Sequence, residues 1–195
     1  MVCFDEQLVQ LLANVHPTRS VKPGHPRRQD YEYERRGTRN VFMFAEPKAG
    51  RRHVLVTRRR TKEDWAKAMR YLVDELYPDA PLIDLVYDNL NTHTANTLIE
   101  IFGKCEAERL LARLVLHPTP LHSSWVNMAE IEFSVMTSQC LDRRIPDAWT
   151  LGIELIAWEG DRNDLHRPIA WSLTWTRAKR IFKKHKPYRK NATQN

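Results

Sequence analysis

Three carboxylate side chains stand beside apolar segments, where their type and placement could support metal-dependent chemistry. Asp5 follows the short apolar stretch 2–4. Asp88 ends the apolar run 82–87, and Glu130 lies near the start of a long amphipathic segment. Ligands of α/β proteins collect at the carboxyl ends of the strands. The placement therefore predicts that the three acids meet at one site.

Carboxylates that meet in a fold repel one another and lose hydration, so a compensating cation is needed. Ligands that are all oxygen suit Mg²⁺ or Mn²⁺. Two such ions, about 3.5–4 Å apart, activate a water and stabilise the leaving oxygen of a phosphodiester. Each acid also has an ordinary interpretation, since strands commonly end on a solvated acid and a first-turn Glu complements the helix dipole.

The segments around these acids alternate between strand and helix patterns. Strands are expected at 2–4, 41–45, 53–57, 82–87 and 114–116. Helices are expected at 61–77, 95–102, 106–113, 126–140 and 147–158, with a last one from about 174. The turn 46–50 joins two strands into a hairpin, and Thr61 with Asp64 forms a helix cap. This order predicts one mixed α/β domain with a central sheet over residues 1–176.

Two regions depart from this alternation. Residues 16–40 are rich in Pro, Arg, Gly and Tyr and show no period, so a long irregular loop is expected there. Residues 177–195 contain eight basic side chains and no acidic one, and they account for the net charge of +7. Such a basic tail favours a polyanion such as nucleic acid as a partner, although a tail that is simply solvated has the same composition.

Composition excludes several other classes of protein. No run approaches the roughly 20 apolar residues that span a bilayer, so no membrane role is expected. The acid pair at 5–6 precedes any long apolar run and argues against a secretory signal. Cys3, Cys105 and Cys140 form no C-x-x-C motif, which argues against a disulfide framework or a cysteine-rich zinc site. A reducing compartment, the cytoplasm, is the expectation.

Four segments resemble the catalytic half of the DDE transposases. They are VCFDEQ (2–7), LVYDNLNTHT (85–94), HPTPLHSSWVNMAEIEFSVMTSQCLDRRI (117–145) and HRPIAWSLTWTRAKRIF (166–182). The nearest group is the mariner-like insertion-sequence-630 family, and the resemblance covers essentially the whole chain. Its most specific piece is the run SSWVNMAE, which ends at Glu130.

The resemblance implies an RNase H-like fold and divalent-metal-dependent DNA strand cleavage and strand transfer at the ends of a mobile element. Asp5 and Asp88 match the two family aspartates, and Glu130 matches the third acid. All three would be catalytic metal ligands, with two Mg²⁺ or Mn²⁺ ions as cofactor. DNA, as insertion-sequence ends and target, would be the partner.

Other residues within these motifs have two interpretations each. Asn89, His93 and Asn127 either orient the ligands or make ordinary loop hydrogen bonds. Glu6 and Glu132 are expected to point away from the site, since positions two apart on a helix do not share a face. Trp125 either fills a core position beside the site or serves as a stacking platform, and the core position is the expectation. The loop histidines are not expected to bind zinc: His117 and His122.

One departure from the family pattern leaves several hypotheses open. Family members carry a helix-turn-helix region before this half, and the sequence begins four residues before Asp5 without one. A decayed remnant and the second frame of a split transposase both fit, as does a homodimer or a separately encoded DNA-binding half as partner. Besides the transposase core, the alternatives are a catalytically silent nucleic-acid binder and an RNase H-type nuclease that cuts RNA in a hybrid.

Overall fold

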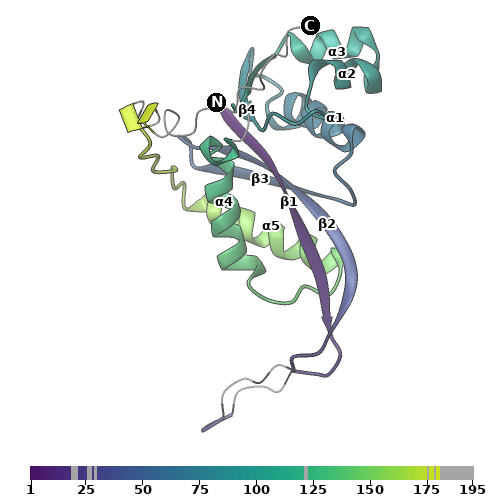
Figure 1. Ribbon diagram of the computed structural model, residues 1–195, viewed down its shortest axis with the longest axis vertical. Coiled ribbons are helices and arrows are strands. Elements are labelled where there is room, and N and C mark those ends of the chain that lie inside the picture. The colour runs from purple at the N-terminus through teal and green to yellow at the C-terminus, as the bar shows by residue number, and fades with distance from the viewer. Residues whose placement is uncertain are drawn as a thin grey trace, which may run out of the picture.

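The computed structural model contains a mixed five-stranded sheet with helices packed against it (Figure 1). The structure describes residues 1–18, 22–25, 28, 30–120, 123–174, 176–177 and 179–180. The strand order is β3-β2-β1-β4-β5, with β1–β2 and β2–β3 antiparallel and β1–β4 and β4–β5 parallel. The strands are β1 (Val2–Asn14), β2 (Tyr33–Glu46), β3 (Arg51–Thr57), β4 (Ile83–Tyr87) and β5 (Leu114–Pro118).

Helices follow the first three strands and separate the later ones. The α-helices are α1 (Lys62–Tyr71), α2 (Ala95–Phe102), α3 (Lys104–Leu111), α4 (Ala129–Met136) and α5 (Ala148–Asp164). Two π-helical turns, η1 (Leu72–Leu76) and η3 (Thr137–Leu141), extend α1 and α4, and a 3₁₀ turn, η2 (Ser124–Val126), precedes α4. Among the described residues, no helix is long and apolar enough to cross a bilayer.

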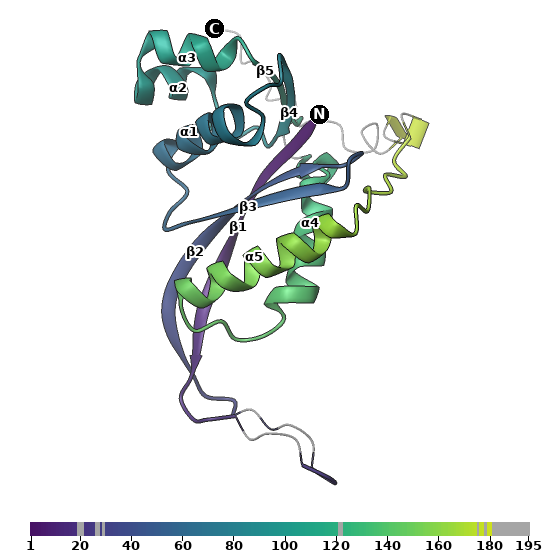
Figure 2. The same cartoon turned by 180° about the vertical axis from the view of Figure 1, so that it is seen from behind.

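The helices form two layers because the central strands are apolar on both faces. Phe42 of β2 packs with Trp65 of α1 in a core that also includes residues of α2 and α3. The next residue, Met43, packs with Leu155 of α5 in a second core shared with α4. Successive strand side chains point to opposite faces, so adjacent residues of β2 serve different cores. Figure 2 shows α1–α3 and α4–α5 as separate groups.

Helix α5 lies along the edge strand β3, and its side chains form hydrogen bonds with main-chain groups of β3 that do not pair with β2. The Asn163 amide accepts a hydrogen bond from Arg52 N and donates one to Arg52 O, both at 2.8 Å. The Glu159 carboxylate accepts from Val54 N at 2.9 Å. These bonds hold α5 against the sheet.

The structure corrects the expected bounds of the first two strands. The strand expected at 2–4 continues to Asn14, and the loop expected at 16–40 is shorter because β2 begins at Tyr33. Tyr33 pairs with Asn14, so the two strands form a long arm that extends from the body (Figure 1). The first six residues of β2 are exposed. No apolar alternation therefore marks this part of β2 in the sequence.

Most other elements confirm the expectations. The turn 46–50 forms the hairpin, and Thr61 and Asp64 make the reciprocal capping bonds of α1. Gly50 has a φ of 69°, and a Cβ there would lie 2.7 Å from the main chain of His166 and Arg167, so glycine is required. The helix expected from 126 begins at Ala129, and α5 ends at Asp164 instead of 158. Most of the expected basic tail, residues 181–195, lies outside the described residues.

Candidate active site

Asp5 and Asp88 are neighbours because β1 and β4 pair in parallel. The pairing runs from Val2 with Leu85 to Phe4 with Tyr87, and Asp5 and Asp88 are the next residue on each strand. Asp88 comes directly after β4, as expected. Asp5 does not end its strand, however. β4 ends at Tyr87 while β1 continues, so from Asp5 onward β1 has no strand partner on the β4 side among the described residues.

Glu130 is the second residue of α4, which packs against β1 and β2. Asn127 fixes the start of this helix to the sheet. Its buried amide donates to Phe4 O at 2.8 Å and to Asp88 Oδ1 at 3.4 Å, and accepts from Ala129 N at 3.2 Å. One side chain therefore links β1, the Asp88 carboxylate and the helix that carries Glu130.

The three acids interact electrostatically. Burial raises the pKa of Asp5 to about 7; the Glu6 N–H bond opposes the shift, and the charges of Asp88 and Glu130 add to it. Burial and the charge of Asp88 also raise the pKa of Glu130. Asp5 Oδ1 accepts from Glu6 N at 2.8 Å, while Asp5 Oδ2 is buried without a hydrogen-bond partner. The charges of Asp88 and Glu130 thus act on Asp5, although no choice of one carboxylate oxygen from each acid places all three within 4.8 Å of one another. We call these three residues the acid cluster.

The donor atoms of this cluster are of the type that binds a hard divalent cation. All of its donors are carboxylate oxygens, and one of them is buried without a hydrogen-bond partner. A bound cation would offset the desolvation that raises the pKa of Asp5. Glu130 is exposed and borders an open groove that includes Gln7, Ser134 and Ser138, so this acid is accessible from outside.

Glu6 points away from the cluster, as predicted. Its carboxylate lies 3.2 Å from Arg60 Nη1 and 3.6 Å from His93 Nε2. The buried His93 ring stacks on Trp65 at 5.3 Å, and its Nδ1 lies 3.4 Å from Asp88 O. His93 therefore supports the main chain at Asp88 from the opposite face of the sheet.

Glu132 also points away, into a buried ion cluster that sequence reasoning missed. Arg52 Nε and Nη2 donate to its two carboxylate oxygens at 2.7 Å, and Arg162 Nη2 donates at 3.2 Å. Arg52 Nη2 also donates to Arg167 O. Because Glu132 and Glu130 share α4, the cluster fixes the helix that carries Glu130. The sequence did contain one signal of this burial: Glu132 lies among the apolar residues of the helix side that faces the core.

The structure also describes the surroundings of Trp125, Asn89 and His117. Trp125 is 43% exposed, so the expected core position is wrong. Asn89 is exposed in the loop after β4. The imidazole of His117 pairs with Asp84 at 2.9 Å, and His122 lies outside the described residues.

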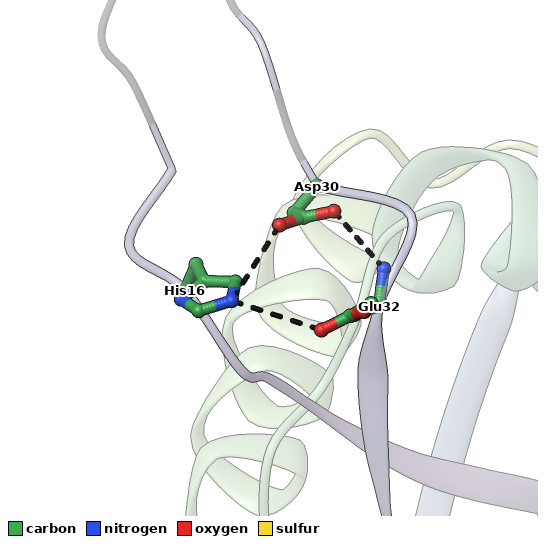
Figure 3. Close-up of side chains that lie close together, drawn as sticks. All are labelled: His16, Asp30 and Glu32. Atoms are coloured by element: carbon green, nitrogen blue, oxygen red, sulfur yellow. Dashed lines mark hydrogen bonds and ion pairs between the residues drawn. The ribbon is translucent and has the colours of Figure 1, made fainter.

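A second group of ligand-type side chains lies at the far end of the β1–β2 arm, just beyond the pair formed by Asn14 and Tyr33 (Figure 3). This group consists of His16, Asp30 and Glu32. Within the described part of the chain, it is the set of three such side chains that each offer one ligand atom, all within 4.8 Å of one another. His16 Nε2 is 3.9 Å from Asp30 and 3.7 Å from Glu32, and its side chain is 62% exposed. His16 forms ion pairs with the two carboxylates when its ring is protonated. Arg144 bonds to the main chain of 30–32 and holds the same segment.

The chain is similar in fold to several solved structures of the Mos1 transposase. The crystal structure of the Mos1 strand transfer complex matches with a TM-score of 0.57 and 14% identity, over 82% of this chain and 46% of that chain. The Mos1 mariner paired end complex with Mn matches with a TM-score of 0.56 and 14% identity, over 85% of this chain and 49% of that chain. The catalytic domain of Mos1 mariner transposase matches with a TM-score of 0.53 and 13% identity, over 83% of this chain and 71% of that chain. The fold is therefore the RNase H-like fold of transposase catalytic domains.

The family follows from the sequence comparison. The model of the DDE superfamily endonucleases matches residues 1–152, so the chain belongs to this superfamily. No curated protein matches the chain. The chain spans about half the length of the first two Mos1 chains that it resembles.

Proposed function

We propose that the chain is the catalytic core of a DNA transposase that cleaves and joins DNA strands at the ends of an insertion sequence. Its membership of the DDE superfamily endonucleases supports this reaction class. The observation that supports the proposal is the buried Asp5 carboxylate, on which the charges of Asp88 and Glu130 act and one of whose oxygens has no hydrogen-bond partner.

In this proposal the three acids are the ligands of Mg²⁺ or Mn²⁺, with two ions as the preferred number. Divalent metals are general in the family, and one similar structure is a complex with Mn. When bound, such ions supply Lewis-acid activation of a water and stabilisation of the leaving oxygen. The chain's residues orient the ligands: Asn127 holds the Asp88 carboxylate, and the Arg52–Glu132 pair holds α4.

DNA is the proposed partner. The Mos1 strand transfer and transposon-end complexes support this assignment, as does the basic composition of the chain. Arg58, Arg59 and Arg60 are exposed after β3, and Arg35 and Arg36 are exposed on the β1–β2 arm. The basic residues of 177–195 remain the main proposed contact with phosphates.

Divalent-metal-dependent nicking of supercoiled DNA tests the proposal. The parent should nick in Mn²⁺ or Mg²⁺ and not in EDTA, and Asp88→Asn should reduce nicking to background. Asp84→Asn is the matched control because Asp84 is exposed on the same strand and pairs with His117. Equal nicking by the parent and Asp88→Asn would contradict the assigned site.

The same preparation separates the alternatives. A parent that binds DNA in a salt-sensitive way but never nicks would support the silent binder. Faster cleavage of the RNA strand of an RNA–DNA hybrid than of duplex DNA would support the RNase H-type nuclease.

A further inference from the structure

Helix α5 carries an apolar stripe that faces away from the protein. Its core side is formed by Leu151, Leu155 and Trp158, all buried. On the opposite side, Trp149 is 79% exposed, Ile153 49% and Ile156 71%. Steps of four and three residues place these three side chains on one helix face. A contiguous exposed apolar surface of this kind marks an interaction site.

Two glycines in α5 have no explanation within the described structure. Gly in a helix interior is about 1 kcal/mol less favourable than Ala. A Cβ at Gly152 or at Gly160 would meet nothing within 4 Å, so internal packing does not require glycine at either position. Gly160 lies 11 residues after Trp149, close to three helical turns, and therefore belongs to the same stripe. The helix surface is hollow at this point.

We propose that the stripe is the contact between two copies of this chain, which pair through antiparallel α5 helices. A two-fold axis at the level of 154–155 places Trp149 opposite Gly160 of the partner subunit. It also places Ile153 opposite Ile156 of the partner subunit. The largest side chain of each stripe thus meets the hollow of the other, twice by symmetry. An isologous interface requires this self-complementarity, whereas a contact with a different protein does not.

The charges at the ends of the helix favour the same antiparallel arrangement. Asp161 and Asp164 lie at the C-terminal end of α5. Arg143 and Arg144 precede its N-terminal end. Arg143 pairs with Glu154, whereas Arg144 bonds to main-chain oxygens of 30–32, which leave its positive charge uncancelled. Antiparallel pairing brings basic residues of one copy near acidic residues of the other, and it also opposes the helix dipoles. Parallel pairing would bring like charges together.

The exposed area limits the strength of this contact. An aromatic side chain buries roughly 150–250 Å², and two partly exposed Ile residues add less. Stable interfaces bury about 800 Å² on each partner, so α5 pairing alone gives a weak, concentration-dependent dimer. Helix α5 lies along β3, at the opposite edge of the sheet from β5, and none of the stripe residues belongs to the acid cluster.

Sedimentation velocity of the full chain over a wide concentration range tests the proposal. The parent should shift from monomer to dimer as concentration rises, and Ile156→Asp should stay monomeric. Ile99→Asp is the matched control, since Ile99 is 42% exposed on α2 and should not change the dimer. A parent that stays monomeric at every concentration, or an Ile156→Asp variant that dimerises like the parent, would overturn the proposal.

A size exchange tests the register. Gly160→Trp places two Trp side chains opposite each other and should weaken the dimer, as should Trp149→Gly. The double variant Trp149→Gly/Gly160→Trp restores one large residue opposite one small one, so it should dimerise again. Thermal melts check that each variant is folded, because both positions face outward. A double variant that remains as weak as the single variants would overturn the proposed register.

Discussion

Two groups of buried charges within this fold differ in how they are compensated. Glu132 has Arg52 and Arg162 within hydrogen-bond distance, and both Glu132 and Arg52 are almost completely buried. Asp5 has only a main-chain N–H as a hydrogen-bond donor, and two further acids stand near it. The first group holds β3, α4 and α5 together. The second group is costly to the folded protein without a cation, which is typical of a site retained for chemistry.

Breaking the compensated group should have the largest effect on stability. Glu132→Ala leaves Arg52 buried without its carboxylate, which should cost about 3–5 kcal/mol of unfolding free energy. Urea denaturation of the variant measures this cost. Glu63→Ala, which removes an exposed acid paired with Lys67, should change stability by less than about 0.5 kcal/mol. A similar small change in Glu132→Ala would contradict the comparison.

Removing a charge from the uncompensated group, which contains Asp5, should stabilise the metal-free protein instead of destabilising it. The pKa of Asp5 is raised from 3.8 to about 7, so the folded protein holds the proton more tightly than the unfolded chain. The metal-free protein should therefore lose stability as pH rises from about 4 to about 7. Asp5→Asn should remove this loss, so at pH 8 its free energy of unfolding should exceed that of the parent by up to about 4 kcal/mol. Thermal melts in EDTA from about pH 4 to pH 8 check both expectations; a variant with a lower melting temperature than the parent at pH 8 would contradict them.

Adding a cation should reduce the difference between the two groups. Mg²⁺ or Mn²⁺ at one hundred times its Kd should stabilise the parent by about 2.7 kcal/mol, and Asp88→Asn should gain much less. Ca²⁺ should stabilise as well, because binding requires only oxygen ligands. Melts at constant ionic strength, with Asp84→Asn as control, measure the gain. If the melting temperature of the parent did not change with added metal, the assignment of the three acids as metal ligands would be contradicted.

The smallest expected effect concerns the link between the strands and α4. Asn127→Ala removes the donor to Phe4 O and to Asp88 Oδ1 and should cost about 1–2 kcal/mol. It should also reduce the stabilisation by Mg²⁺, because the Asp88 carboxylate is less well held. Asn89→Ala, in the exposed loop, is the control for both measurements. Unchanged metal stabilisation in Asn127→Ala would limit its role to stability.

Local signals explain which parts of this structure could be predicted. The hairpin turn and the Thr61 cap depend on adjacent residues. Asp5, Asp88 and Glu130 stand out in the sequence through apolar runs and a family motif, and their role stays a prediction. The arm of β2 and the Glu132 cluster depend on partners far away in the chain. Arg52 and Glu132, 80 positions apart, show no common pattern in the sequence. Their charges read as ordinary surface residues until the fold buries them.

The bonds between α5 and β3 have a consequence for the growth of the sheet. A strand at the border of a sheet presents free N–H and C=O groups on which a strand of another molecule can add. Asn163 occupies both groups of Arg52, and Glu159 occupies the N–H of Val54, so side chains of a helix take the place of a sixth strand. On this border the chain is protected against strand addition and fibrillar aggregation. Contacts between molecules on this side are left to the outer face of the helix.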